Sequence, residues 1–600
     1  MSIVQLKRLT LYGTTEQKDV VLGGLQELGC LHLVNLQPRT ERMKQMPSAE
    51  PKDTYDALRY LESSPMRRRP ASEDEDYDIE AIVEKALFNR QRRRAVHDRR
   101  DELRQQIREV EPWGDFRLPA PSELGGLQLF FYVVPLHKMG QVRESDLTWQ
   151  VINKDHRNAY VVVVADTQPA ADAMPAPPVD MGRLSLSELK WQEELAEAEA
   201  EELLAARWTL TRWLGLMRRD LARAENRAAL EFAATQTYDS AEVFAVQGWV
   251  PVKLTDALAQ FAGEQGLAYT LEEPGPSDTP PVLLENPSRL AAGEDLVAFF
   301  QLPGYRDWDP SMVVFVSFAL FFAMILSDAG YAAVLGLALA FMWRRMGRNT
   351  AGRRLRSLAA AIGAASVTYG VLVGSYFGLA PAAGSLLGTL KVLEINDFDS
   401  MMKLAIVVGG VHVAVANLMV AFNRRKSWSA LAPLGWILLV VGFLSLVVRG
   451  AEDVFDTVFP WIMGFGLVLI LFFSSQRSVA AVGDFLWRLL DGLMAVTGVS
   501  SWFGDILSYL RLFALGLSSA ALAVTFNQLA VQSMDVPGIG LLFGLAILIL
   551  GHVLNLVLAI ISGVVHGLRL NLIEFYNWGV SGEGDTFRAF RKKETLSWTK

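Results

Sequence analysis

The stretch SYLRLFALGLSSAAL, residues 508–522, decides the fold class of half the chain, because it is almost wholly apolar yet contains Arg511. Extended to 501–531, the run is long enough to cross a bilayer core, which takes about 20 helical residues. Arg511 lies about ten residues into it, too deep to reach the nearer membrane surface easily. A charge at that depth costs roughly 2.5–3.5 kcal/mol. We therefore expect Arg511 to face a polar cavity or a partner carboxylate.

Further apolar runs follow Pro310 and predict an all-α membrane domain over 301–600. The run 311–343 is too long for one helix, and SDAGYA at 327–332 offers a turn that splits it, with Asp328 as a capping or turn residue at the outer surface. Residues 484–500 are interpreted as an interfacial helix. The eight predicted spans are 311–327, 329–343, 357–380, 402–422, 430–448, 456–474, 501–531 and 540–575.

The basic residues orient these spans. If the N-terminal half and the C-terminus are cytoplasmic, sixteen Lys and Arg residues of the C-terminal half fall in inside segments. Only Lys391, Lys403 and Arg449 fall outside. This asymmetry follows the positive-inside rule. Without the split at Asp328, every later loop would lie on the opposite side of the membrane and the basic clusters would be outside. Eight spans is therefore the consistent prediction.

The N-terminal half has a different composition. Residues 1–300 carry a net charge of −13 and residues 301–600 a net charge of +5. The N-terminus has no apolar run typical of a signal peptide, so we expect an acidic, water-soluble cytoplasmic arm. Two strand-helix-strand patterns, within about 1–40 and 240–285, are expected to pair into one α/β lobe. LQLFFYVVP and AYVVVVAD, within 111–184, predict a second, distal lobe.

Charged, Pro-free helical segments at 76–110 and 186–232 lie between the lobes, within predicted coiled-coil arms at about 50–110 and 185–235. Leu210, Leu214, Met217 and Leu221 recur at spacings of 4, 3 and 4, which favours an antiparallel coiled coil. The second segment, read as one helix, would be about 70 Å long. The predicted fold is therefore N-terminal α/β lobes joined by an antiparallel coiled coil (α+β), followed by an all-α domain of eight transmembrane helices.

Several chemistries are not expected. The sequence contains no G-x-x-x-x-G-K-[ST] and no Gly-Lys dipeptide, so we do not expect the chain to hydrolyse nucleotide by itself. The one cysteine, Cys30, offers no thiolate cluster, and the histidines lack a recognisable metal-ligand spacing. We predict no catalytic residue, cofactor, metal site or nucleic-acid partner.

The eighth predicted span carries a polar stripe. Treated as a uniform α-helix, it places its polar side chains within an arc of about 120°. That arc should face water or another helix, because lipid would penalise it. Interhelical hydrogen bonding is the alternative explanation for its histidines and for His412. The stripe contains His552, Asn555, Ser562, His566, Arg569 and Glu574.

The seventh span carries its own narrow polar stripe. Ser508 and Ser518 lie near the side of Arg511, whereas Asp505 lies on the opposite side of a regular helix and is a poor partner for it. The candidate ion-translocation residues are Arg511, Arg569, Glu574, His566, His552, Asn555 and Ser508.

These residues resemble a known family. SYLRLFALGLSSAALA and GHVLNLVLAIISGVVHGLRLNLIEFYNWGVSGEGDTFRAF closely resemble the a subunit, called subunit I in prokaryotes, of V-type and archaeal-type rotary ATPases. YRDWDPSMVVF, SDAGYA and VFAVQGWVP look like the same family's signatures in the same order. The likeness covers essentially the whole chain and is most specific in the last two spans. This chain has Ser327 where the family often has Gly, and RDWD at 306–309 replaces a shorter acidic pair.

The resemblance implies a static ion-translocating subunit in a prokaryotic plasma membrane. Arg511 would be the essential arginine facing a proteolipid ring, and Arg569 the second arginine. His552, Asn555, His566 and Glu574 match polar positions near the ion path. The implied partners are the proteolipid c-ring, the helical subunits of the peripheral stalks, a central-stalk adaptor subunit and the lipid bilayer. The chain would not be an enzyme alone.

A mechanism accompanies this resemblance. A ring carboxylate must be neutral while it crosses lipid, and a fixed cation stabilises its ionised form so that the bound ion is released. Arginine suits this task because it stays protonated. A stand-alone ion-coupled secondary transporter is the main alternative, although we see no internal repeat. A membrane-anchored signalling protein is a further alternative, and it would leave Arg511 and Arg569 without a role.

Overall fold

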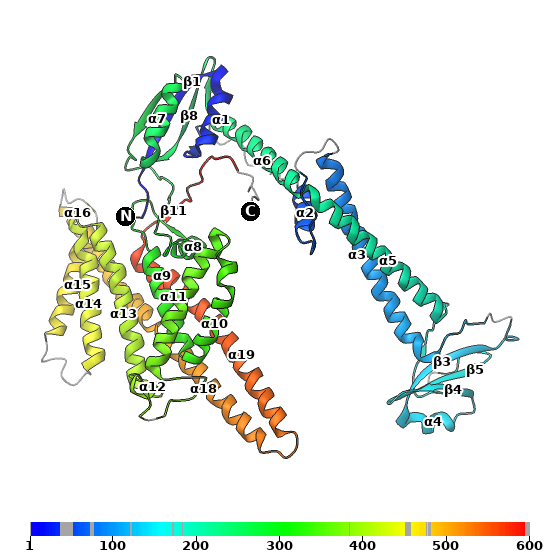
Figure 1. Cartoon of the computed structure of the whole chain (residues 1–600). Coiled ribbons are helices and arrows are strands. Elements are labelled where there is room, and N and C mark those ends of the chain that lie inside the picture. The colour runs from blue at the N-terminus through cyan, green and yellow to red at the C-terminus, as the bar shows by residue number, and fades with distance from the viewer. Residues whose placement is uncertain are drawn as a thin grey trace. The chain divides into compact units, whose positions relative to one another are not determined.

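The computed structural model describes residues 2–36, 52–71, 77–119, 123–170, 173–182, 184–382, 384–449, 458–475, 477 and 482–593. The chain divides into two compact units, which are described separately (Figure 1). The first contains Met1–Leu36 and Gln236–Phe590, and the second contains Gln37–Thr235 and Arg591–Lys600. Each unit is thus built from segments distant in sequence.

The first unit contains an antiparallel sheet with strand order β2-β8-β1-β9, and β7 pairs with β8. The predicted pairing of the two strand-helix-strand patterns is confirmed, because Leu9 of β1 is opposite Gly248 of β8. A Cβ at Gly248 would lie 2.5 Å from the backbone oxygen of His32, so glycine allows β2 to approach. The elements are β1 (Leu6–Thr14), α1 (Lys18–Leu28), β2 (His32–Val34), β7 (Tyr238–Ser240), β8 (Val243–Pro251), α7 (Thr255–Glu264) and β9 (Ala268–Glu272).

The second unit contains the charged helices. Helix α3 packs along α5, and Arg92 Nε lies 2.6 Å from Glu199 Oε1 across the pair. The predicted single helix over 186–232 is wrong, because a 3-10 turn at Thr211–Trp213 separates α5 from α6. Leu214, Met217 and Leu221 are buried, as their spacing predicted. The coiled coil itself stays a prediction. These helices are α2 (Lys52–Glu62), α3 (Ile79–Val110), α5 (Leu186–Leu210) and α6 (Leu214–Gln236).

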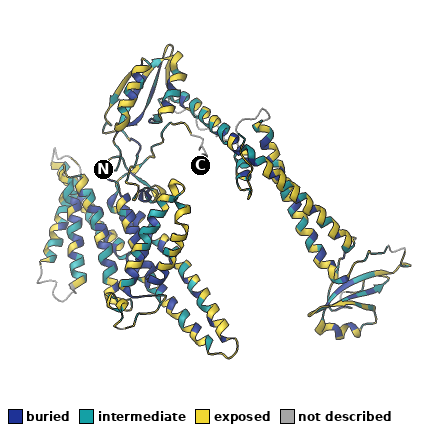
Figure 2. Ribbon diagram, in the orientation of Figure 1, coloured by how far each residue is buried: buried dark blue, intermediate teal, exposed yellow. Residues whose placement is uncertain are grey.

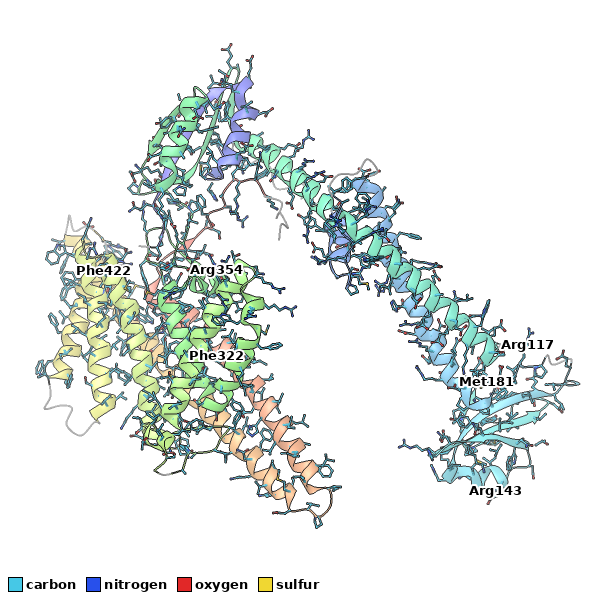
Figure 3. The ribbon with its side chains drawn as sticks, viewed as in Figure 1. Arg117, Arg143, Met181, Phe322, Arg354 and Phe422 are labelled. Atoms are coloured by element: carbon cyan, nitrogen blue, oxygen red, sulfur yellow. The ribbon has the colours of Figure 1, made fainter. Side chains whose placement is uncertain are left out.

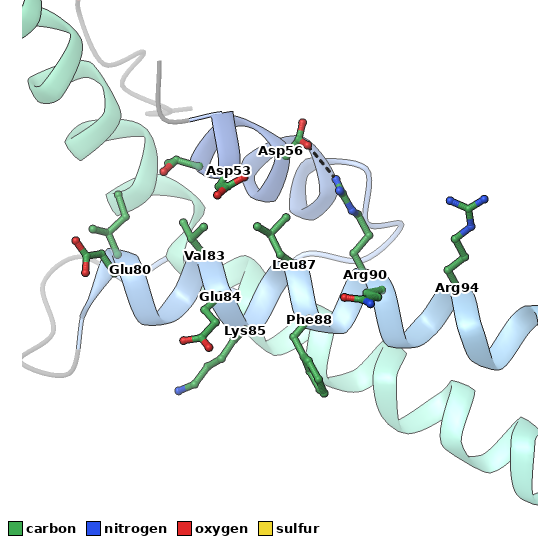
Figure 4. A pocket seen from close by; sticks show the side chains of 13 residues that line it. Asp53, Asp56, Glu80, Val83, Glu84, Lys85, Leu87, Phe88, Arg90 and Arg94 are labelled. Atoms are coloured by element: carbon green, nitrogen blue, oxygen red, sulfur yellow. Dashed lines mark ion pairs between the residues drawn. The ribbon is translucent and has the colours of Figure 1, made fainter. Parts of the chain in front are cut away.

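Helix α2 lies against α3 and forms a surface groove with it (Figure 4). Acidic Asp53 and apolar Val83 and Leu87 line this groove. Arg90 Nη1 lies 3.5 Å from Asp56 Oδ2 and joins the two helices at the surface. Because both of these side chains are substantially exposed, such a pair adds little stability.

A four-stranded sheet with order β4-β5-β3-β6 completes the second unit. Strands β3 and β5 are the two apolar runs that the sequence predicted as a lobe, and they pair antiparallel. Trp113 packs edge-on against Phe131 and Tyr160, while Met181 joins the same apolar cluster where helices and sheet meet (Figure 3). The elements are β3 (Gln128–Pro135), α4 (Met139–Arg143), β4 (Thr148–Lys154), β5 (Asn158–Ala165) and β6 (Pro178–Val179).

The rest of the first unit is a bundle of apolar helices whose buried residues lie between helices (Figure 2). Its helices are α8 (Ala292–Phe300), α9 (Ser311–Leu326), α10 (Ala329–Met346), α11 (Thr350–Val373), α12 (Leu386–Thr389), α13 (Phe398–Asn423), α14 (Leu431–Arg449), α15 (Phe459–Phe473), α16 (Val482–Thr497), α17 (Val499–Leu507), α18 (Leu510–Met534), α19 (Gly540–Arg569) and α20 (Tyr576–Gly579), with a π-helical turn at Leu570–Phe575.

Among the described residues, five helical stretches are long and apolar enough to cross a membrane. Two shorter apolar helices, Ser311–Leu326 and Phe459–Phe473, accompany them. The count of eight spans therefore stays a prediction. The five stretches are Thr350–Val373, Phe398–Asn423, Trp428–Val448, Val482–Met534 and Gly540–Gly579.

Several predicted boundaries change. The split between the first two spans is confirmed, and Ser327 ends α9 in the left-handed conformation, with φ of 49°. Glycine adopts this conformation without strain, so Ser327 carries a conformational cost at this turn. The predicted span 357–380 is wrong at its end, because α11 stops at Val373. The predicted span 501–531 is not continuous, since Ser508 and Tyr509 separate α17 from α18.

Helix α19 packs through a row of small residues. Gly551, Ala559, Gly563 and Gly567 are buried on one face of α19 at intervals of four or eight residues. A Cβ at Gly563 would lie 2.7 Å from the ring of Phe322, which Figure 3 shows inside the bundle. Small residues let helices approach closely, and in membranes this packing is a main source of helix association.

The segment after α20 returns to the sheet of the first unit. Strand β11 (Glu583–Gly584) pairs with β10 (Leu302–Pro303), and the backbone of 585–587 bonds to Val282. Arg588 N then donates to His32 Nδ1 at 2.9 Å, and Phe590 N donates to Leu31 O at 2.7 Å. The chain that leaves α19 is therefore fastened to the N-terminal sheet.

Candidate functional site

Two arginines converge on one buried carboxylate at the junction of α18 and the end of α19. Glu574 Oε1 lies 3.8 Å from Arg511 Nη1 and 3.5 Å from Arg569 Nε. The Glu574 side chain is 3% exposed, whereas those of Arg511 and Arg569 are 23% and 52% exposed. The expectation that Arg511 meets a partner carboxylate is confirmed. We call these three residues the arginine cluster.

A π-helical turn aims Glu574 at the arginines. The turn Leu570–Phe575 holds more residues than an α-helical turn, so the side-chain positions after Arg569 shift around the helix axis. Asn571 anchors the turn, because Nδ2 donates to Gly567 O at 2.8 Å and Oδ1 accepts from Ser317 Oγ of α9. The uniform 100° spacing assumed for the polar stripe is therefore wrong beyond Arg569. π-turns occur often at functional sites.

Two contacts flank the arginine cluster and fix its spacing. His412 of α13 stacks on Phe575, with ring centroids 4.3 Å apart, and its Nδ1 hydrogen bonds to Tyr509 Oη at 2.8 Å. On the other side, Trp578 Nε1 donates to Asp505 Oδ2 at 2.8 Å. Asp505 thus pairs away from Arg511, as its position on the helix predicted.

A second polar group lies further along α19, and we call it the tyrosine network. Tyr331 Oη hydrogen bonds to His552 Nδ1 at 2.7 Å and accepts from Asn555 Nδ2 at 3.0 Å. Asn555 Nδ2 also donates to Ser519 O, and His552 Nε2 contacts Asn527 Oδ1 at 3.0 Å. Asn555 and Arg569 are about 21 Å apart along the helix at about 1.5 Å per residue.

Asp328 lies in the turn between α9 and α10 and holds the start of α10, which carries Tyr331 of the tyrosine network. Its carboxylate caps α10 by accepting from Tyr331 N at 3.0 Å, which confirms its predicted capping role. It also accepts from Ser375 Oγ at 2.6 Å and from Phe377 N and Gly378 N at 3.0 Å. The residue is 3% exposed, so its carboxylate is buried within the protein. Its predicted place at the outer side of a membrane stays a prediction.

The predicted site residues therefore divide between two places. Arg511, Arg569 and Glu574 form the arginine cluster, and His552 and Asn555 belong to the tyrosine network. Interhelical hydrogen bonding is confirmed for His552 and His412.

Two predicted site residues form no hydrogen bond to either group among the described residues. His566 Nδ1 is buried without a hydrogen-bond partner among the described residues. Ser508 Oγ bonds back to Gly504 O of its own helix at 3.0 Å, so it joins neither group by a hydrogen bond that the structure describes.

Sequence reasoning missed several members of these groups. Tyr331, Ser519, Asn527 and Asn571 are polar residues within apolar helices, and that composition is the signal that would have singled them out. Within the described part of the chain, no group of three His, Cys, Asp or Glu side chains is placed to hold a metal ion.

The fold and the site define a class of protein. Apolar helices long enough for a bilayer enclose an arginine pair, and a mixed α/β part precedes them in sequence, so the chain is a membrane protein with ionisable residues inside its helical part. No family model matches the chain.

Proteins of known name do match it. V-type ATP synthase subunit I of Chlamydia pneumoniae is 27% identical over 594 residues, covering 86% of this chain and 87% of that protein. V-type ATP synthase subunit I of Borreliella burgdorferi is 22% identical, covering 98% and 99%. A-type ATP synthase subunit I of Methanocaldococcus jannaschii is 26% identical, covering 68% and 63%. The chain is thus a relative of subunit I of the V-type and A-type ATP synthases.

Among solved structures, the cytoplasmic N-terminal domain of subunit I of V-ATPase matches 44% of this chain and 99% of that structure. The identity is 15% and the TM-score is 0.20.

Proposed function

We propose that the chain is the static ion-translocating subunit of a V/A-type rotary ATPase or ATP synthase. Its membrane part supplies one access route from each side of the membrane to a proteolipid ring. Arg511 forces the passing ring carboxylate to release its ion. The chain has no catalytic role alone and works as a membrane subunit of the complex.

The arginine cluster is the observation that supports this proposal most. Arg511 is only partly neutralised, because Glu574 is shared with Arg569 and lies beyond hydrogen-bond distance of Arg511 Nη1. A partly neutralised cation inside the membrane attracts a carboxylate and stabilises its ionised form. The ring carboxylate therefore loses its ion when it reaches Arg511, and the same cation blocks a continuous leak past the ring.

The tyrosine network fits the route on one side of Arg511. His552 and Asn555 are hydrogen-bonding groups that can pass an ion or its water. Asn555 lies about 21 Å and His552 about 26 Å along α19 from Arg569. His566 lies on the same helix between the two groups. Two offset routes are what turns ion flow into rotation, because each route reaches the ring at a different place.

The remaining assignments follow from the relatives and the charge pattern. Residues 1–300 act as the cytoplasmic stator arm, with a proximal lobe, helical arms and a distal lobe. Residues 301–600 form the eight-span membrane domain in a prokaryotic plasma membrane. The arm binds the helical subunits of the peripheral stalks, and the membrane domain contacts the c-ring beside the central-stalk adaptor subunit.

Substitution of the central arginine tests the proposal. In the reconstituted whole complex, Arg511→Gln should lower ATP-driven ion uptake at least about 100-fold, while the complex still assembles. Ser518→Ala, on the same helix, is the matched control and should retain uptake. Undiminished coupled uptake in Arg511→Gln would refute the proposal. Solute transport by the chain alone in liposomes would instead favour a secondary transporter.

A further inference from the structure

The arginine cluster has an uneven charge balance. Two guanidinium groups share a single carboxylate, so the three side chains carry one net positive charge when Glu574 is ionised. Two uncompensated cations this close together in a membrane would be strongly disfavoured. A single carboxylate therefore allows both arginines to occupy the site and still leaves one positive charge.

The contacts are loose enough to be exchanged. Glu574 Oε1 is 3.8 Å from Arg511 Nη1, which is an ion-pair distance but not a hydrogen bond. Within the described residues, Arg511 Nη1 and Glu574 Oε2 are both buried without a hydrogen-bond partner. Arg511 therefore keeps donor capacity for a second carboxylate while Glu574 holds it in place.

The protein holds this loose spacing with rigid contacts. His412 bridges Phe575, next to Glu574, and Tyr509, two residues before Arg511. The Trp578–Asp505 hydrogen bond joins the same two segments one turn further on. Because both bridges are buried or half-buried and the π-turn is pinned by Asn571, the separation of Glu574 from Arg511 is set by the fold.

We infer that Glu574 is a positioning residue, the resident counterion that neutralises one of the two arginines and leaves a single positive charge for the carboxylate of the passing ring. This inference rests on the proposed function and assigns a role within it. With Glu574 ionised, the arriving carboxylate brings the cluster to neutrality. Without that charge, two arginines would hold the ring carboxylate and delay its departure.

Other charged and titratable groups face this site. Asp505 is the second carboxylate nearby, but it bonds to Trp578 and forms no ion pair with either arginine in the described part of the chain. The groups around Glu574 are Arg511, Arg569, Asp505, His566, His412 and Tyr509. Asp505 therefore provides a matched control for a carboxylate that does not pair with the arginines.

Charge and shape can be separated by substitution in the assembled complex. Glu574→Gln keeps the shape and removes the charge, and Glu574→Asp keeps the charge. Asp505→Asn removes a negative charge that forms no ion pair with the arginines in the described part of the chain, and it keeps an oxygen that can accept from Trp578 Nε1. Each variant is reconstituted with the ring, checked for assembly by native gel electrophoresis, and assayed for ATP-driven ion uptake. We expect Glu574→Gln to lower uptake about tenfold, and Glu574→Asp and Asp505→Asn to retain at least about half.

The outcomes decide between charge and structure. Uptake in Glu574→Gln within about twofold of the unaltered complex would overturn the inference. An equal loss in Glu574→Asp would also overturn it, because side-chain length rather than charge would then matter. An equal loss in Asp505→Asn would overturn it as well. Arg511→Gln is measured beside them. If Glu574→Gln retains uptake while Arg511→Gln loses it, the inference on Glu574 fails and the proposed function stands.

Discussion

The tyrosine network and the arginine cluster are both polar groups inside apolar helices, but they differ in how many of their polar atoms are hydrogen-bonded. In the tyrosine network, Tyr331, His552 and Asn555 hydrogen bond to one another, and Asp328 beneath them accepts four hydrogen bonds. In the arginine cluster, Glu574 contacts its arginines only at 3.5 and 3.8 Å. The polar atoms of the tyrosine network are thus saturated with hydrogen bonds, and those of the arginine cluster are not.

This difference separates polar groups that stabilise the fold from charged groups that can exchange one ion-pair partner for another. A saturated buried network rigidifies its surroundings, since breaking any one bond leaves a buried group unpaired. An unsaturated charged cluster adds little stability, because desolvation offsets the attraction between its charges. Substitutions in the tyrosine network should therefore lower stability in addition to affecting transport, whereas substitutions in the arginine cluster should affect transport with little change in stability.

The largest effect on stability is expected at Asp328. Asp328→Ala leaves Ser375 Oγ and three backbone N–H groups without their acceptor, which should lower the free energy of unfolding by at least about 3 kcal/mol. Thermal unfolding in detergent measures this loss. Asp328→Asn, which keeps one acceptor oxygen, should lose less. A loss under about 1 kcal/mol in Asp328→Ala would contradict the saturated description.

A smaller loss is expected when one hydroxyl is removed from the tyrosine network. Tyr331→Phe keeps the ring packed on Phe377 but leaves His552 Nδ1 without its partner. The free energy of unfolding should fall by about 1–3 kcal/mol. Thermal unfolding of Tyr369→Phe on α11 provides the matched control. Equal stability of Tyr331→Phe and the unaltered protein would show that the network does not hold the fold.

Removal of the central arginine should change stability least among the membrane substitutions. Arg511→Met deletes a charge but leaves Glu574 paired with Arg569, so the free energy of unfolding should stay within about 1 kcal/mol or rise. The same thermal unfolding assay, run beside the uptake assay, tests this. A loss as large as that of Asp328→Ala would mean that the arginine cluster also holds the fold, and the comparison would fail.

The smallest effect concerns pH and lies outside the membrane helices. Burial lowers the pKa of His32, whose neutral Nδ1 accepts from Arg588 N. The neutral form is thus favoured in the folded state, so the contact is fully present above the ordinary pKa of about 6.5 and is lost as pH falls below it. After correction for the intrinsic exchange rate, which itself slows toward acid, the protection factors of the amides in the 581–590 segment should fall as pH decreases below about 6.5 and through the lowered pKa of His32. His32→Gln should remove that pH dependence.

The sequence predicted much of the local structure for physical reasons that are local. Alternating apolar residues located the strands that pair as β1 with β8 and β3 with β5. Apolar length located the helices, and the turn at Ser327 and Asp328 followed from its residues. The break before Arg511 was missed because its apolar composition does not distinguish a helix end from its continuation. The early end of α11 had a signal in Gly374, which caps the helix with φ of 70°, but apolar length alone did not take it into account.

The sequence by itself determined which segments are apolar and that charges such as Arg511 and Glu574 lie within them. Only the tertiary structure decided that these two meet and that His552 bonds to Tyr331 instead. Apolar periodicity is a property of neighbouring residues, whereas the partner of a buried polar group is chosen among helices distant in the chain. For Glu574, the position of the carboxylate is set by the π-turn and by the His412–Tyr509 and Trp578–Asp505 hydrogen bonds.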